Sequence, residues 1–353
     1  MPSETEVVAP NFKRRLSGVT STIVQLVPLQ ARILRIAALG PGLPSHLPKL
    51  RFRDLLRFWK RPATRPFRIW HARRNLEMLP GIVMRDLLRM PLRLVFTSAA
   101  QRHHTGWTRF LISRMDAVIA TSARSAAFLH RPASVVLHGI DLDRFGPDGP
   151  VADALPSRLV VGCSGRIRHQ KGTDLFVEAM IALLPRFPEW TAVVTGRATA
   201  EHSSFQSDLI ERAKAAGLAD RILFLGEVED VAPWFRRFDL YVAPPRNEGF
   251  GLTPLEAMAS GTPVVASDAG AFNELVLDGI TGRVVPVGDA AVLAAAIEPF
   301  MADPTLRAEA GRAALAHVRS RFPLQREADE IEAVYRGLWS EAEKSPSAMS
   351  TRR

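Results

Sequence analysis

Short apolar runs that alternate with helical patterns constrain the fold of this chain most strongly. Between residues 159 and 267, five such runs occur, and each is followed by a stretch with helical periodicity. Short runs without polar alternation are typical of strands that are buried on both faces of a parallel sheet. Strands joined through helices form a doubly wound α/β domain, in which ligands bind at the carboxyl ends of the strands. The expected strands are 159–165, 190–196, 222–226, 240–243 and 263–267.

The same alternation, less regular, occupies the first half of the chain. The stretch 144–157 is rich in Pro and Gly and interrupts the pattern, so we place a domain boundary there. A chain of 353 residues exceeds one ordinary core, and we expect two α/β domains, 1–150 and 151–324, that face one another across a cleft. The polar tail 341–353 is expected to be disordered. The expected strands of the first half are 5–12, 35–40, 67–71, 92–97, 117–121 and 134–138, with helices from Thr20 onward through Pro28, between 67–71 and 92–97, and at 123–129.

Charge is divided unevenly between the two halves. Residues 1–150 hold 24 Lys and Arg against 9 Asp and Glu, whereas the remainder holds 22 against 27. Such a basic half suits an anionic partner, namely a membrane surface, a phosphorylated glycolipid or nucleic acid, although a general solubility bias explains it equally well. Within it, residues 51–60 alternate basic and bulky apolar side chains. This pattern is typical of a helix on an anionic membrane or of an amphipathic helix packed on a sheet.

The remaining composition favours a protein of the cytoplasm. No apolar run approaches the roughly 18–20 residues of a membrane span. The acidic N-terminus lacks the order of charged and apolar residues that marks a signal peptide. The single cysteine, Cys163, excludes an internal disulfide and a thiolate cluster.

The stretch Asn247–Glu256 links a buried strand to a helix through a turn that contains two glycines. Thr253 is expected to be the N-cap and Pro254 the first helical residue. Backbone N–H groups at the start of a helix suit a phosphate. Glu248 and Glu256 bracket this turn. As a pair they resemble the acid and nucleophile of a glycosidase, but Glu256 also has the spacing to close a capping box with Thr253.

A second feature, Gly165–Gly172, follows an expected strand of the same sheet. Its basic residues therefore lie above the same sheet edge as the Glu248 loop. Arg166, with a planar fork, and Lys171, as a point charge, are suited to a diphosphate. The stretch is not a Walker A loop, because it lacks a Gly directly before Lys171 and a Ser or Thr directly after it. The alternative is a solvated basic turn.

These stretches, in this order, resemble one family. The ordered set resembles the retaining glycosyltransferases of family GT4, which have the GT-B fold of two Rossmann-like domains. The stretches of this chain that form the set are 165–172, 224–228, 248–256 and 261–266. The resemblance implies that Arg166 and Lys171 bind the nucleotide diphosphate and that Glu256 binds the ribose. It implies that the strand ending at Glu227 and Val228 lies by the nucleobase. It also implies contacts to the donor sugar and phosphate from Glu248, which orients the sugar, and from Phe250, Gly251, Leu252 and Thr253.

The N-terminal half resembles the family less closely. Gly18, after Ser17, stands where members carry a Gly-Gly pair in the first loop. Many members carry a His just after the strand that corresponds to 92–97, which implies a catalytic or acceptor-contacting role for His103 or His104. The alternative is that both are structural. The family also implies that the helix at about 325–340 returns to the N-terminal, acceptor-binding domain.

The whole chain is most similar to the subgroup of lipopolysaccharide core mannosyltransferases. That resemblance implies transfer of mannose from GDP-mannose to a Kdo residue of a lipid A precursor, by an enzyme held peripherally at the cytoplasmic face of the inner membrane. We expect no metal, because the Asp-x-Asp at Asp141 and Asp143 lies in the interdomain connection and two cations can neutralise the leaving group. The alternatives are a UDP-dependent glucosyl- or galactosyltransferase and a non-catalytic binder of anionic glycolipid. A nucleic-acid binder would need stacking aromatics, for which Phe52, Phe58 and Trp59 qualify only loosely.

Overall fold

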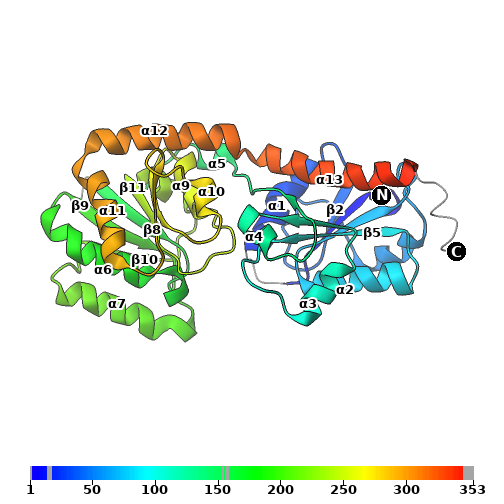
Figure 1. Ribbon diagram of the computed structural model, residues 1–353, viewed down its shortest axis with the longest axis horizontal. Helices are drawn as coiled ribbons and strands as arrows, with labels where there is room; N and C mark the ends of the chain where they lie inside the picture. Colours follow the sequence, from blue (N-terminus) through cyan, green and yellow to red (C-terminus); the bar gives the residue numbers. More distant parts are fainter. Residues whose placement is uncertain (1, 14–17, 153–154, 156–158, 345–353) are drawn as a thin grey trace. The chain divides into compact units, whose positions relative to one another are not determined.

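The computed structural model describes residues 2–13, 18–152, 155 and 159–344 (Figure 1). The chain forms two compact units, one of Met1–Gly139 with Leu324–Arg353 and one of Ile140–Pro323. The chain therefore passes from the first unit to the second about ten residues before the expected boundary at 150. The reason is that the stretch after Ile140 is bonded to the second unit. Ser260 Oγ donates to the carbonyl of Phe145 at 2.8 Å, and Arg236 Nε donates to that of Gly146 at 2.7 Å.

The first unit is built on a seven-stranded parallel sheet with the order β3-β2-β1-β4-β5-β6-β7. Successive side chains of a strand point to opposite faces. Val7 accordingly packs into one core cluster and Val8 into the other, so both faces of the sheet are covered. The strands are β1 (Val7–Pro10), β2 (Ile36–Leu39), β3 (Lys49–Leu50), β4 (Arg68–Ala72), β5 (Leu92–Ser98), β6 (Ala117–Ala120) and β7 (Ser134–Val135).

Helical segments connect these strands and cover the sheet. Met78 and Met84, from neighbouring helical segments, are buried in the same core cluster as Leu111. The segments are η1 (Pro2–Glu4), α1 (Gly18–Gln30), η2 (Phe52–Trp59), α2 (Asn75–Ile82), η3 (Val83–Leu87), α3 (Gly106–Ser113), α4 (Ala123–Ala127) and, from the end of the chain, α13 (Leu324–Lys344). Among the described residues, no helix is long and apolar enough to cross a bilayer.

Helix α13 belongs to the first unit because its apolar side packs into the core of that unit. Tyr335 and Trp339 are fully buried there. The Tyr335 hydroxyl lies 2.5 Å from Nδ1 of His71, whose Nε2 lies 2.7 Å from the hydroxyl of Thr97. Burial lowers the pKa of His71 well below its ordinary value, so this imidazole is neutral. The carboxylate of Glu327 accepts a hydrogen bond from the backbone N–H of Gly139 at 2.8 Å.

The second unit is built on a six-stranded parallel sheet with the order β10-β9-β8-β11-β12-β13. This order makes β8 and β11 neighbours, although 75 residues separate the end of one from the start of the other. The loops that follow them therefore meet at one edge of the sheet. The strands are β8 (Leu159–Ser164), β9 (Trp190–Thr195), β10 (Ile222–Gly226), β11 (Leu240–Ala243), β12 (Val264–Ser267) and β13 (Gly282–Val285).

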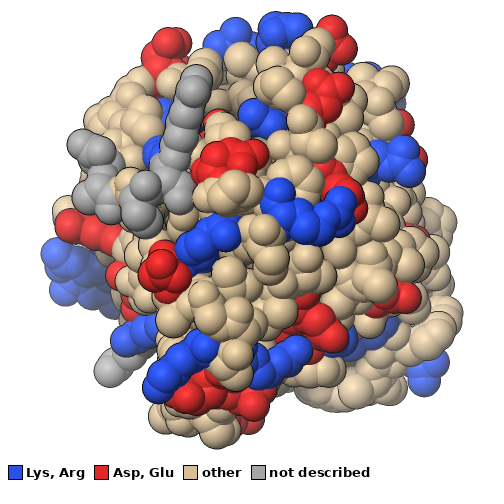
Figure 2. Space-filling model, turned by 90° about the vertical axis from the view of Figure 1, so that its left-hand side faces the viewer, with Lys and Arg blue, Asp and Glu red and all other residues tan. Residues whose placement is uncertain are grey.

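Helices cover both faces of this second sheet (Figure 1). The side of the molecule that carries α7 mixes Lys and Arg with Asp and Glu and shows no field of a single sign (Figure 2). The helical segments are α5 (Leu142–Phe145), η4 (His169–Lys171), α6 (Thr173–Leu183), η5 (Leu184–Arg186), η6 (Ala200–His202), α7 (Ser203–Ala215), α8 (Ala232–Arg237), α9 (Thr253–Ala259), α10 (Phe272–Leu275), α11 (Ala290–Ala302) and α12 (Pro304–Arg321).

The sequence predicted the doubly wound class correctly and missed several short elements. It did not predict β3, β13 or α3. Residues 52–59 form a 3-10 helix, η2, in which Phe58 is buried. The helix predicted at 325–340 continues to Lys344, so the first four residues of the expected tail are helical, and residues 345–353 lie outside the described part of the chain.

Candidate active site

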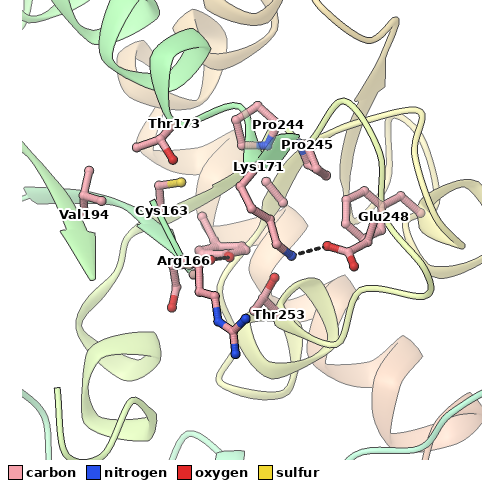
Figure 3. Close-up of a pocket in the computed structure, with 14 residues that line it drawn as sticks. Cys163, Arg166, Lys171, Thr173, Val194, Pro244, Pro245, Glu248 and Thr253 are labelled. Atoms are coloured by element: carbon pink, nitrogen blue, oxygen red, sulfur yellow. Dashed lines mark hydrogen bonds and ion pairs between the residues drawn. The ribbon is translucent and has the colours of Figure 1, made fainter. Parts of the chain in front are cut away.

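A pocket opens in the second unit where β8 and β11 end (Figure 3). It is a small recess that is open to solvent. β8 leads into the Gly165–Gly172 loop, and β11 leads through Pro244 and Pro245 into the Glu248 loop. The residues around it are Cys163, Ser164, Gly165, Arg166, Lys171, Thr173, Val194, Tyr241, Ala243, Pro244, Pro245, Glu248, Thr253 and Phe272.

Two residues singled out in the sequence form an ion pair in this pocket. The Nζ of Lys171 donates to the Glu248 carboxylate, as the dashed line in Figure 3 marks. The two side chains are 27% and 19% exposed, so the pair is partly shielded from water. Arg166 lines the same pocket and is exposed. The pocket therefore holds two cations and one carboxylate that a charged ligand can reach.

A second ion pair fastens the two loops together. The guanidinium of Arg246 donates to both oxygens of the Asp174 carboxylate at 2.8 Å each. Its Nη1 also donates to the carbonyl of His169, and its backbone N–H donates to the carbonyl of Gln170 at 2.9 Å. A bidentate pair of this kind fixes orientation as well as distance. The sequence analysis named neither Arg246 nor Asp174.

The same two loops touch at Gly172. This residue has a φ of +69°, and a Cβ atom placed on it would lie 1.8 Å from the carbonyl oxygen of Pro244. Only glycine allows the backbone that follows Lys171 to approach the end of β11 this closely. The spacing of Lys171 and Glu248 therefore depends on Gly172.

Comparison with known proteins identifies the family. The protein family described as "Glycosyl transferases group 1" matches residues 158–303. The lipopolysaccharide core biosynthesis mannosyltransferase LpcC of Rhizobium leguminosarum bv. viciae is 62% identical over 341 residues, which are 95% of this chain and 97% of that protein. This chain belongs to the group 1 glycosyltransferases.

A second relative agrees with this placement, and a solved structure shares the fold. The lipopolysaccharide core biosynthesis mannosyltransferase LpsB of Rhizobium meliloti (strain 1021) is 58% identical over 95% of this chain and 98% of its own length. The crystal structure of Anabaena Alr3699/HepE in complex with UDP has a TM-score of 0.79 and 19% identity, and the match covers 94% of this chain and 100% of the other. At that identity the likeness concerns the fold, which is the GT-B fold expected from the sequence.

Contacts within the second unit hold the turn after Glu248 in this glycosyltransferase. The ring of Phe250 is buried, and Gly251 and Leu252 are not among the residues around the pocket. Gly251 has a φ of +90°, and a Cβ atom there would lie 2.1 Å from the Phe272 ring. The backbone N–H of Ala271 donates to the carbonyl of Phe250 at 3.1 Å. The buried ring and this hydrogen bond thus fix Phe250 within the loop.

Helix α9 begins one residue earlier than predicted. Thr253 is its first residue and Leu252 is the N-cap, with no side-chain hydrogen bond at the cap, so the capping box with Glu256 does not form. Thr253 lies inside the first helical turn and lines the pocket, so its side chain does not take the cap position. Glu256 is half-buried, and burial raises the pKa of its carboxyl to about 7, an effect that Arg144 reduces.

Glu227 and Val228 follow β10 at the same carboxyl edge, outside the lining of the pocket. Oε2 of Glu227 lies 2.7 Å from Nε of Arg197, and both side chains are more than 60% exposed. Arg197 follows β9, which lies between β8 and β10. The sequence analysis did not single out Arg197, because nothing in its local sequence distinguishes it from other surface arginines.

The first unit holds the remaining predicted residues. His104 lines a separate pocket together with Arg109, His130 and Arg131. Burial, Arg102 and His130 lower the pKa of His104, and its buried Nε2 has no hydrogen-bond partner. The His103 ring packs edge-on against Phe128, with centroids 5.3 Å apart. Gly18 begins α1, and nothing lies within 4 Å of where its Cβ would be. Ser17 lies outside the described residues.

Two groups that might suggest metal or thiol chemistry have other roles. One oxygen of Asp141 accepts hydrogen bonds from the backbone N–H groups of Asp143 and Arg144, which caps α5. Within the described ranges, no cluster of three or more His, Cys, Asp or Glu side chains has the arrangement of a metal site. Cys163 lies at the pocket, and burial raises the pKa of its thiol to about 12, so it is neutral.

Proposed function

We propose that this glycosyltransferase moves mannose from GDP-mannose to the Kdo inner core of a lipopolysaccharide or lipid A precursor, with retention of anomeric configuration. The observation that carries the proposal is the 62% identity to LpcC over nearly the whole of both chains. The 58% identity to LpsB supports it. Both relatives are named as lipopolysaccharide core mannosyltransferases.

The donor half of the proposal uses the pocket of the second unit. Arg166 and Lys171 would bind the diphosphate and stabilise the charge that develops on it as the glycosidic bond breaks. Glu248 would accept hydroxyl hydrogen bonds from the donor sugar and orient its anomeric carbon, which makes catalysis chiefly a matter of positioning. Glu256 would accept the ribose hydroxyls. The base would lie by Glu227 and Val228, with backbone phosphate contacts from Phe250, Gly251, Leu252 and Thr253.

The acceptor half of the proposal uses the first unit. Its surplus of Lys and Arg suits an acceptor that bears Kdo carboxylates and lipid phosphates. His104, or His103 beside it, would contact the acceptor, and Gly18 would contact the nucleotide-sugar donor. The enzyme would work peripherally at the cytoplasmic face of the inner membrane, without a metal ion.

Calorimetry with the two candidate nucleotides tests the donor assignment. We expect GDP to bind to the purified protein at least tenfold more tightly than UDP. Equal or tighter binding of UDP would contradict the assignment of GDP-mannose and favour a UDP-dependent glucosyl- or galactosyltransferase. A variant with Glu248→Ala separates an enzyme from a glycolipid-binding protein, because only an enzyme would lose its activity in the cell.

A further inference from the structure

One side of the first unit exposes large apolar side chains in a row. Helix α2 and the helical turn η3 form one continuous stretch, and Leu76, Leu79, Val83 and Leu87 stand out from it. They are 59%, 43%, 38% and 74% exposed. Their spacing of three or four residues places them on one side of the helical stretch. Buried residues on the opposite side of the helical stretch pack into the core, so the exposed row takes no part in that core.

Helix α3 extends this row with two aromatic side chains. Trp107 and Phe110 are 53% and 52% exposed, and their rings stack with centroids 5.7 Å apart. The side-chain amide of Asn75 donates to the hydroxyl of Thr108 at 2.7 Å, which ties the start of α2 to α3. Figure 1 shows the two helices next to each other. We call Leu76, Leu79, Val83, Leu87, Trp107 and Phe110 the apolar face.

The short helix η2 adjoins the other end of the apolar face. The indole N–H of Trp59 donates to the carbonyl of Leu88 at 2.9 Å. Trp59 and Leu56 are 49% and 70% exposed. The ring of Phe58 points inward and is fully buried, with the guanidinium of Arg68 4.6 Å from its centroid. One side of residues 51–60 therefore packs on the fold, as the second interpretation of the sequence predicted, and the exposed side is the part to which the membrane interpretation applies.

The charges around the apolar face are those expected for an anionic partner. Residues 51–116 hold 15 Lys and Arg against 4 Asp and Glu. The carboxylate of Asp86 is paired with Arg85 and Arg114, and that of Asp116 with Arg85 and Arg93. Exposed guanidinium groups at the margin come from Arg57, Arg89 and Arg109. These two carboxylates are thus already paired, and the arginines at the margin remain available to phosphate groups.

We propose that the apolar face lies in the headgroup region of an anionic bilayer, with the marginal arginines on lipid phosphates. Aromatic rings with apolar bodies favour the membrane interface, and Leu side chains add buried area. Each Lys or Arg held near an anionic surface adds electrostatic attraction. A monomeric soluble protein rarely leaves a contiguous apolar patch of this kind without a binding role. The inference rests on the proposed function in one respect, namely that the acceptor is a lipid.

Vesicle binding by the full-length protein tests this face without donor or acceptor. We expect co-sedimentation with vesicles of phosphatidylcholine and phosphatidylglycerol and weak binding to phosphatidylcholine alone. Changing Leu79→Gln together with Leu87→Gln should lower the partition coefficient at least tenfold. The matched control is Ile280→Gln with Val287→Gln in the second unit, where the side chains are 58% and 46% exposed. It should bind as the wild type does.

Two readouts keep the inference separate from the proposed function. On a water-soluble Kdo oligosaccharide, the double Leu variant should retain wild-type turnover, whereas its turnover on acceptor in vesicles should fall at least tenfold. Vesicle binding without any mannosyl transfer would contradict the proposed function alone. Unchanged vesicle binding by the double Leu variant would overturn the inference. So would its dissociation from dimer to monomer in sedimentation, because the face would then join two copies of this chain.

Discussion

Lys171 and Glu248, which lie 77 residues apart in the chain, form an ion pair at the pocket of the second unit. The pair joins the group proposed for the diphosphate to the group proposed for the sugar. A bound donor would have to divide it, because the ammonium is needed at the phosphates and the carboxylate at the hexose hydroxyls. Without ligand, each residue holds the other in place, which preorganises the pocket.

Replacing Glu248 should therefore separate binding from turnover. Glu248→Gln leaves the shape of the side chain and removes the anion beside Lys171, so affinity for GDP should be unchanged or higher. Turnover should fall by roughly a hundredfold or more, because the sugar is no longer oriented. Lys171→Met should instead weaken GDP binding by about 1.5–3 kcal/mol, the loss of a charge-assisted hydrogen bond. Calorimetry measures the GDP affinity of both variants, and donor kinetics measure their turnover. Equal losses of GDP affinity in the two variants would contradict the separate roles of Glu248 and Lys171.

The contact between the two loops predicts an unequal effect of two glycine substitutions. Gly172 and Gly217 have φ values of +69° and +70°, so alanine carries the same backbone strain at either position, about 1–2 kcal/mol. Only at Gly172 would the new Cβ meet a neighbour, the Pro244 carbonyl at 1.8 Å; at Gly217 nothing lies within 4 Å. Gly172→Ala should raise the donor KM at least about tenfold by moving Lys171, while Gly217→Ala should change only the melting temperature. Similar donor KM values in the two variants would show that the contact does not position the site.

The position of Lys171 and Glu248 at one edge of the sheet could be predicted from the sequence, because it depends on local patterns. Each residue follows a short apolar run, and parallel strands place their carboxyl ends at one edge. The fold class could be predicted for the same reason.

Other parts of the site depend on contacts that no local pattern reveals. Arg246 lies in the loop after β11 and Asp174 in the first turn of α6, 72 residues apart in the chain. Thr253 has the sequence of an N-cap, but the helix begins at Thr253 itself, with Leu252 at the cap position. The apolar face was also hidden, because Leu76 and Leu87 lie in a stretch expected only to be a helix, and α3, which supplies Trp107, was not predicted.

The raised pKa of Glu256 predicts a pH-dependent affinity for the nucleotide. With a pKa of about 7 instead of the ordinary 4.5, the carboxyl is mostly protonated at pH 6 and mostly ionised at pH 8. Ribose hydroxyls that donate to Glu256 favour its ionised form, so GDP binding should tighten as the pH rises through 7. Below pH 7, binding should release protons from the Glu256 carboxyl. Calorimetry in buffers of different ionisation enthalpy measures the release. Glu256→Gln should abolish this pH dependence, and its persistence in that variant would assign it to another group.

Chelation should leave the transferase active. Arg166 and Lys171 both line the pocket and can together neutralise the leaving diphosphate. The initial rate of sugar transfer with excess EDTA should therefore equal the untreated rate. A loss of turnover that Mg²⁺ restores would contradict metal independence.

The most direct measurement is the product that the purified enzyme makes on a Kdo-bearing lipid A precursor. Mass spectrometry after incubation with GDP-mannose should show the gain of one hexose, and NMR should show the α-configuration of the donor retained in the new linkage. UDP-glucose and UDP-galactose in parallel incubations should give no gain. Transfer from a UDP-sugar but not from GDP-mannose, or a product with inverted configuration, would contradict the account.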